Sequence, residues 1–188
     1  MGSSGIVIRN RNRNRNRNRN QGVAMQKTKT RTKGFSLIEL LIVVAIILVI
    51  AAIAIPSFLH SRMAANESAA VAAVRTLNTA QNSFNSAYPT VGFASTLAVL
   101  GGSGASCTPP TETNACLIDE NLAGGQRSGY SFTLSNVTGT PNSTYNVIAA
   151  PNLVNYSGVR YFCSYADAVV RVSMAAITTC DGSVPPQQ

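Results

Sequence analysis

The feature that most constrains this chain is an uninterrupted apolar run. Residues 40–55 are sixteen consecutive residues without a polar side chain, and counting from Phe35 the largely apolar segment has 21 residues. At 1.5 Å per residue, a helix of that length spans roughly 31 Å, which matches the hydrocarbon core of a bilayer. The segment can therefore cross a membrane as a single helix.

One carboxylate stands at the start of this run. Glu39 is the only acidic or basic side chain, histidine aside, between Phe35 and Ser61. A charged side chain in a membrane helix costs on the order of 2.5 to 3.5 kcal/mol at mid-bilayer and less near the interface. We therefore expect Glu39 to have a functional partner.

The residues around Glu39 form a known type of signal. Gly34 followed by Phe35, a small-polar and aliphatic triplet and then Glu39 resembles the class III signal of type IV prepilins and pseudopilins. The resemblance implies that a prepilin peptidase in the membrane cuts between Gly34 and Phe35 and then methylates the new Phe35 amine. It also implies that Glu39 registers an incoming subunit against its neighbour's amino terminus. A carboxylate near a free amine and the positive end of a helix is favourable, so its own terminus or a neighbour's could be the partner.

Two simpler interpretations compete with this one. The segment could be a plain single-pass anchor, or a cleaved secretory signal, since Ala52-Ile53-Ala54 has the small-x-small pattern of such cleavage sites. Ordinary signal h-regions run about 7 to 15 residues and do not begin with a glutamate. The prepilin interpretation fits the run better.

Charge is segregated along the chain. Residues 1–34 hold ten of the fifteen Lys and Arg residues and no acid, whereas residues 35–188 hold five basic and seven acidic residues, a net of −2. Basic residues beside an apolar helix stay in the cytoplasm, which sends everything after Ile55 outward. We expect a basic leader, residues 1–34, that is removed on maturation from an inner-membrane precursor with a periplasmic carboxyl terminus.

An Arg-Asn repeat fills residues 9–20, and with no apolar residue to bury it should be disordered. Met25 opens a ten-residue basic leader that resembles those of many type IVa pilins, so we expect translation to begin there and residues 1–24 to be a gene-start artefact or an added tail. An alternative of another class is a membrane-anchored nucleic-acid binder that uses the repeat as an arm on phosphates. We expect no nucleic-acid partner for the mature form, because the leader would be gone.

The helix should continue beyond the apolar run. Pro56 predicts a kink rather than a stop. Beyond Pro56, apolar residues form a stripe at spacings of three, four and seven residues, which predicts an amphipathic helix that ends near Pro89. The stripe comprises Val71, Val74, Leu77, Phe84 and Tyr88, and the polar residues expected largely off it are Asn66, Glu67, Arg75, Asn78 and Asn82. We assign residues 35–58 to a transmembrane or filament-core helix, 59–88 to the amphipathic helix and 89–188 to a globular periplasmic or extracellular β domain.

The carboxyl-terminal half is rich in turn and strand signals. Gly101-Gly102-Ser103-Gly104 marks a loop, and residues 130–135, 145–149, 159–165 and 168–174 are candidate strands. We expect an antiparallel sheet of about four strands with the helix stripe on one face. The fold class is α+β, and it matches the lollipop architecture of type IV pilins.

Four cysteines allow three pairings. We expect Cys107 to pair with Cys116, and Cys163 with Cys180, the second closing a loop that resembles the disulfide-bounded region of many pilins. Zinc ligation is the rival, but the sequence has no Cys-x-x-Cys pair and a single histidine, His60.

The sequence offers no acid–base pair, triad or phosphate loop, so we expect neither an enzyme nor a cofactor. Aromatic residues at helical spacing along the chain favour packing over electron conduction. The segments that begin at Asn136, Asn142 and Asn155 match the glycosylation sequon, but such short motifs occur by chance.

These patterns together predict a major type IV pilin or pilin-like subunit that homo-oligomerises into a helical surface filament. Its expected partners are the prepilin peptidase, the inner-membrane assembly machinery and, before assembly, membrane lipid. The runner-up is a type II secretion pseudopilin. The helix has Leu48 where many pilins carry glycine. The sequence leaves open whether the filament serves adhesion, twitching motility, DNA uptake or secretion.

Overall fold

The structure is a computed structural model that describes residues 34–102, 107 and 109–187 of the 188-residue chain. The expected basic leader up to Lys33, the Arg-Asn repeat and the start at Met25 lie outside the described residues. So do Ser103 and Gly104 of the expected loop.

The amino-terminal element is the helix α1, Leu37–Ala87, of 51 residues. Its first backbone bond runs from the Leu40 N–H to the Ser36 carbonyl at 3.2 Å, so the helix begins two residues later than expected. It continues through Pro56 and ends at Ala87, as expected, because the residue before Pro89 is disfavoured in helical conformation. From Ile42 onward, α1 belongs to one compact unit with the residues that follow it.

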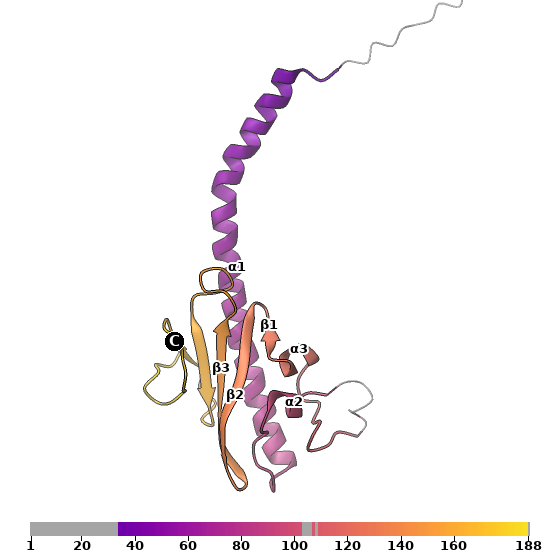
Figure 1. The fold of residues 1–188 in the computed structure, drawn as a ribbon, viewed down its shortest axis with the longest axis vertical. Coiled ribbons are helices and arrows are strands. Elements are labelled where there is room, and N and C mark those ends of the chain that lie inside the picture. Colours follow the sequence, from indigo (N-terminus) through magenta and orange to yellow (C-terminus); the bar gives the residue numbers. More distant parts are fainter. Residues whose placement is uncertain (1–33, 103–106, 108, 188) are drawn as a thin grey trace, which may run out of the picture. The chain divides into compact units, whose positions relative to one another are not determined.

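The sheet is an antiparallel meander of five strands in the order β1-β2-β3-β4-β5 (Figure 1). The strands are β1 Gln126–Arg127, β2 Tyr130–Gly139, β3 Asn142–Pro151, β4 Tyr161–Tyr165 and β5 Arg171–Ser173. The sequence predicted about four strands, and the additional one, β1, has only two residues, too few to show an alternating pattern.

The last two strands are shorter than expected, for identifiable reasons. The N–H groups of Val159 and Arg160 donate to a side chain of α1 instead of a neighbouring strand, so β4 begins only at Tyr161. Ala168 has φ +59, a left-handed conformation that does not continue a strand, so β5 begins only at Arg171.

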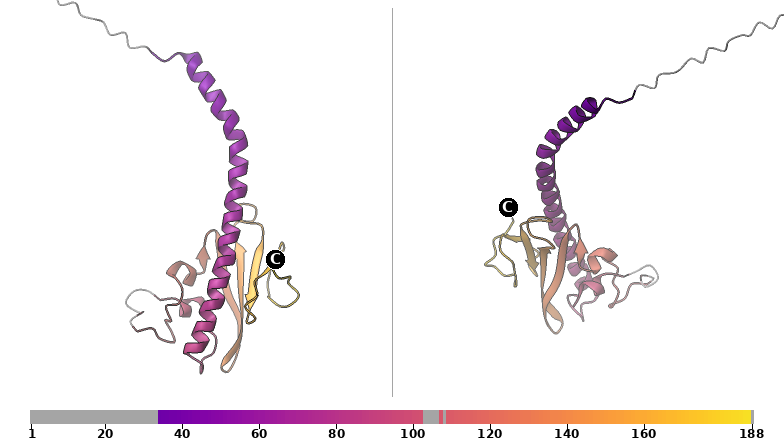
Figure 2. Two further views of the ribbon diagram at one scale, coloured as in Figure 1. Left: turned by 180° about the vertical axis from the view of Figure 1, so that it is seen from behind. Right: turned by 45° about the horizontal axis from the view of Figure 1, so that its top comes forward.

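The carboxyl-terminal half of α1 covers one face of this sheet (Figures 1 and 2). Val74, Leu77 and Phe84 are fully buried there, against sheet residues such as Phe132 and Phe162, which confirms the expected stripe. Burying each such side chain contributes about 1.5 to 3 kcal/mol. Helix–sheet packing therefore gives the expected α+β fold.

Two short helices complete the layer that surrounds the core. They are α2, Leu97–Leu100, and α3, Glu120–Ala123. Each begins with a side-chain cap, since Thr96 accepts from the Val99 N–H and Asp119 accepts from the Leu122 N–H. Leu100 and Leu122, which are fully buried, join these helices to the core.

Two polar side chains of α1 lie elsewhere than expected. Glu67 and Asn78 were predicted to lie largely off the apolar stripe, but they are only 7% and 4% exposed. Each sits seven residues from an apolar member of the stripe, Glu67 from Val74 and Asn78 from Val71, so each faces the same way. Their burial is tolerated because both find polar partners in the sheet domain.

Candidate functional site

The residues expected at the cleavage site lie on an open stretch of backbone. Gly34, Phe35 and Ser36 precede α1, and all three are exposed. A Cβ built on Gly34 meets no atom within 4 Å, and Phe35 is 73% exposed. A protease needs an accessible, non-helical bond, and the bond between Gly34 and Phe35 has both properties within the described residues.

Glu39 lies in the first turn of α1 and is exposed. The unpaired N–H groups of a helix start carry a partial positive charge, which favours a carboxylate at this place. Across residues 34–102, 107 and 109–187, Glu39 takes part in no ion pair. Its carboxylate is therefore available to a group supplied from outside these residues.

The apolar half of α1 has no partner within the described chain. The most apolar window of α1 has a mean hydropathy of 3.3, and none of it is buried. Side chains all around the helix are bare: Ile42 is 52% exposed, Val49 64% and Ile53 74%. This helix is long and apolar enough to cross a membrane, although a signal sequence would pass the same test.

Pro56 lies inside α1 at the end of this apolar surface. Proline has no N–H, so the carbonyl of Ala52, four residues earlier, has no helical donor. The kink expected at Pro56 stays a prediction.

Glu67 ties α1 to the strand side of the domain. Its Oε1 accepts from the N–H groups of Val159 (2.8 Å) and Arg160 (3.1 Å), and its Oε2 accepts from the Arg160 Nε at 2.7 Å. Burial alone raises the pKa of Glu67, but these hydrogen bonds outweigh it and hold the pKa below its ordinary value. The ionised carboxylate therefore links α1 to the backbone and side chain just before β4.

Asn78, on the same buried face of α1, forms a second polar tie to the sheet. Its Nδ2 donates to the Ser164 Oγ (2.9 Å) and to the Ala168 carbonyl (3.1 Å), and its Oδ1 accepts from the Tyr145 hydroxyl at 3.3 Å. Gln81 forms a third, exchanging two bonds with the backbone of Ala94. These ties fix the rotation and height of α1 on the sheet.

Both expected disulfides are present, Cys107–Cys116 and Cys163–Cys180. The second joins β4 to the carboxyl-terminal tail, and the tail also pairs along β5 through the bond from the Val172 N–H to the Pro185 carbonyl. The cysteine pattern pointed to this staple, but the tail's backbone pairing left no signal in the sequence.

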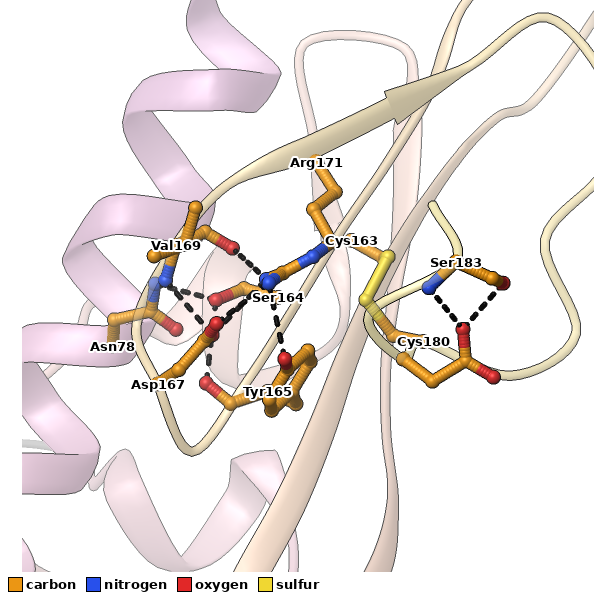
Figure 3. The surroundings of a disulfide bond; sticks show 10 residues. Asn78, Cys163, Ser164, Tyr165, Asp167, Val169, Arg171, Cys180 and Ser183 are labelled. Carbon is orange, nitrogen blue, oxygen red and sulfur yellow. Dashed lines mark hydrogen bonds and ion pairs between the residues drawn. A yellow bond between two sulfur atoms is a disulfide. The ribbon is translucent and has the colours of Figure 1, made fainter. Parts of the chain in front are cut away.

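A charged cluster lies beside the Cys163–Cys180 disulfide (Figure 3). The Arg171 guanidinium donates to both carboxylate oxygens of Asp167, at 2.6 and 3.1 Å, and to the Tyr165 hydroxyl at 3.0 Å. Burial alone raises the pKa of Asp167, but the hydrogen bonds from Arg171 and the Val169 N–H outweigh it, so that pKa is lowered. The cluster closes the turn between β4 and β5.

The described residues contain no group of three or more His, Cys, Asp and Glu side chains that could hold a metal ion. His60 is exposed on α1. The sequence patterns did not identify the three buried polar side chains that join α1 to the rest of the domain, Glu67, Asn78 and Gln81. Their seven-residue spacing from apolar stripe members was the available signal.

Comparison with known proteins concerns the amino-terminal segment. The prokaryotic N-terminal methylation motif matches residues 29–55. The type IV major pilin protein PilA of Myxococcus xanthus (strain DK1622) is 53% identical over 51 residues, which are 27% of this chain and 23% of that pilin. The chain thus matches under a quarter of the length of this curated relative. No solved structure matches the chain.

These findings confirm the resemblance read from Gly34, Phe35 and Glu39. The chain carries a methylation motif, is similar to a major pilin over its amino-terminal segment and has a pilin-like α+β arrangement.

Proposed function

We propose that this chain is a type IV major pilin or a pilin-like structural subunit. It is made as an inner-membrane precursor, cut between Gly34 and Phe35, methylated on the Phe35 amine and assembled into a helical surface filament. The observation that carries the proposal is the combination of the methylation motif with a helix whose apolar half is wholly exposed.

The exposed apolar half requires two successive environments. Each large apolar side chain left in water forgoes about 1.5 to 3 kcal/mol, so this surface cannot stay solvated. Lipid covers it in the precursor, and the helices of other subunits cover it in the filament. Residues 35–58 therefore form the membrane and filament-core segment, 59–88 the helix that carries the domain, and 89–188 the outer domain.

Filament growth needs a contact that repeats without closing. A subunit that touches its neighbour through two different surfaces builds an open helical polymer. Inside an apolar bundle, the Glu39 carboxylate and a neighbour's Phe35 amine supply a charged pair that forms only in the correct axial register.

The cleavage proposal is tested at Gly34. Replacing Gly34 with Leu should leave uncut precursor in the membrane, because a side chain at the cut would not fit the peptidase pocket. The matched control is Gly182→Leu, in the exposed carboxyl-terminal loop, which should be cut normally. Mass spectrometry of the membrane fraction distinguishes the two, and efficient cutting of Gly34→Leu would contradict the assignment.

The registry proposal is tested at Glu39. Glu39→Val should be cut and methylated but should not form filaments, whereas Glu112→Val, an exposed glutamate of the domain, should form them. Electron microscopy of sheared surface material gives the answer. Normal filaments from Glu39→Val would refute the role of this carboxylate.

A type II secretion pseudopilin is the second candidate, since the methylation motif does not separate it from a pilin. Long filaments outside the cell support a pilin, and short periplasmic ones support a pseudopilin. The nucleic-acid alternative is tested by the mass of the mature protein: a chain that begins at methylated Phe35 contains no Arg-Asn arm.

A further inference from the structure

The loop between β3 and β4 displays apolar side chains in an unusual way. Leu153, Val154 and Tyr156 are 62%, 50% and 54% exposed. Single exposed apolar residues are normal on a protein surface, but three within four consecutive positions form a patch. We call these three residues the apolar tip.

The loop that carries the apolar tip is firmly held. The Ser157 Oγ accepts from the Leu153 N–H and donates to the Leu153 carbonyl, both at 3.0 Å. The Asn66 side chain on α1 donates to the Ser157 carbonyl at 2.9 Å. A loop fixed by its own backbone and by α1 cannot turn its apolar side chains inward, so their exposure is a feature of the fold.

The loop between β3 and β4 lies at the end of the sheet from which the apolar half of α1 emerges (Figures 1 and 2). The Arg62 guanidinium on α1 stands 6.0 Å from the centre of the Tyr156 ring. Arg62, Asn66, Leu153 and Tyr156 also line a hollow of about 320 Å³ between the helix and the loop. The cationic Arg62 side chain and the apolar tip therefore lie side by side on one edge, where α1 meets the β3–β4 loop.

The helix sets the depth of this edge in a membrane. If Glu39 lies at the cytoplasmic boundary of the hydrocarbon, the next twenty residues reach Leu59 and span about 30 Å, the thickness of that layer. Arg62 then stands about 4.5 Å beyond Leu59, among the lipid headgroups. Tyrosine and arginine are the side chains that favour this zone, because each combines an apolar body with a polar end.

We propose that the apolar tip and Arg62 dock on the outer leaflet of the inner membrane in the precursor and in the processed subunit before assembly. Leu153, Val154 and Tyr156 enter the headgroup zone, and Arg62 binds lipid phosphate. The occupant is lipid rather than a second copy, because the edge is continuous with the membrane helix and its charge complements anionic headgroups. This inference rests on the membrane insertion in the proposed function.

The chain contains no tryptophan, so a single introduced one reports on a single place. The full chain would be placed at one copy per nanodisc, with phosphatidylglycerol and brominated phosphatidylcholine as the lipids. Leu153→Trp should lose roughly half of its fluorescence relative to nanodiscs without bromine, since an indole favours the interface. Met174→Trp is the matched control, at a site that is 72% exposed in the carboxyl-terminal loop, and should keep its intensity.

A third variant separates this inference from the proposed function. Val49→Trp, in the apolar half of α1, should be strongly quenched if the helix spans the bilayer. An unquenched Leu153→Trp beside a quenched Val49→Trp would overturn the docking proposal and leave insertion intact. An unquenched Val49→Trp would overturn both. If Leu153→Trp is shielded only when several copies share one vesicle, and bromine has no effect on it, a second copy is the occupant and the lipid proposal is wrong.

Discussion

The carboxylate of Glu67 allows a quantitative test of how the long helix is held. Its Oε1 accepts hydrogen bonds from the backbone N–H groups of Val159 and Arg160, and its Oε2 accepts one from the Arg160 Nε. Glu67→Gln therefore keeps both backbone bonds if its amide oxygen takes the place of Oε1, and loses the charged bond to Arg160. A hydrogen bond to a charged group contributes about 1.5 to 3 kcal/mol, so we expect a loss of about 2 kcal/mol in the free energy of unfolding.

Glu67→Ala should cost more than Glu67→Gln. It removes all three bonds and leaves the N–H groups of Val159 and Arg160 without their acceptor. Removing one partner of a buried pair costs about 3 to 5 kcal/mol. The Arg160 side chain is 40% exposed and can regain water, so we expect the lower end, about 3 kcal/mol.

The effect should also depend on pH in a defined direction. The folded state lowers the pKa of Glu67 below its ordinary value of 4.5, so its stabilising contribution is complete above that value and disappears as pH falls through the lower, folded pKa. The difference in stability between the wild-type chain and Glu67→Gln should be constant near neutral pH and should shrink below pH 4.5.

The assay is guanidinium unfolding of the full chain in detergent, followed by tyrosine fluorescence, with extrapolation to zero denaturant. Glu112→Gln, in an exposed turn, is the matched control and should change stability by less than about 0.5 kcal/mol. A loss for Glu67→Gln no larger than that of the control, or a difference that grows on acidification, would refute the reasoning.

Three further predictions concern the domain. Asn78→Ala should lower the free energy of unfolding by about 2 to 3 kcal/mol, because it leaves the buried Tyr145 hydroxyl without its acceptor and removes the donor to the Ser164 hydroxyl and the Ala168 carbonyl. Denaturant midpoints measure this, and a loss under about 0.5 kcal/mol would contradict it. The double variant Cys163→Ala, Cys180→Ala should lose about 3 kcal/mol on the chain-entropy estimate, and an unchanged melting temperature would argue against a structural role for that disulfide. Burial raises the pKa of Tyr145 to about 12 and raises the pKa of Tyr130 further, so two of the six tyrosines should stay protonated at pH 11 in the folded protein. The free energy of unfolding should fall as pH rises above 10.0, because unfolding releases the protons of these two hydroxyls. Tyrosinate absorbance at pH 11 should show six ionised rings only after unfolding, and six ionised rings in the folded protein would refute this.

Much of this protein could be read from the sequence because the signals are local. The apolar run, the motif from Gly34 to Glu39 and the stripe through Val74 and Leu77 each depend on neighbours within a few turns of one helix. The structure confirms the long helix, its buried stripe and the α+β arrangement, and the comparisons confirm the motif. The pairing of Cys163 with Cys180 was also expected, although four cysteines alone allow three connectivities.

The tertiary structure alone decided how the two layers are joined and what the outer domain presents. Glu67 and Asn78 looked like solvated polar residues because their partners, Arg160 and Ser164, lie more than eighty residues away in the chain. The bonds from the Val159 and Arg160 N–H groups to Glu67 shortened β4, and the bond from Asn66 to Ser157 holds the preceding β3–β4 loop against the helix. The exposed apolar tip near Arg62 likewise exists only because that loop is tied to α1. The sequence by itself determined which segment must leave water, since that depends on composition along one helix. Which polar groups are buried, and which apolar ones are displayed, depends on contacts between distant segments that no local pattern records.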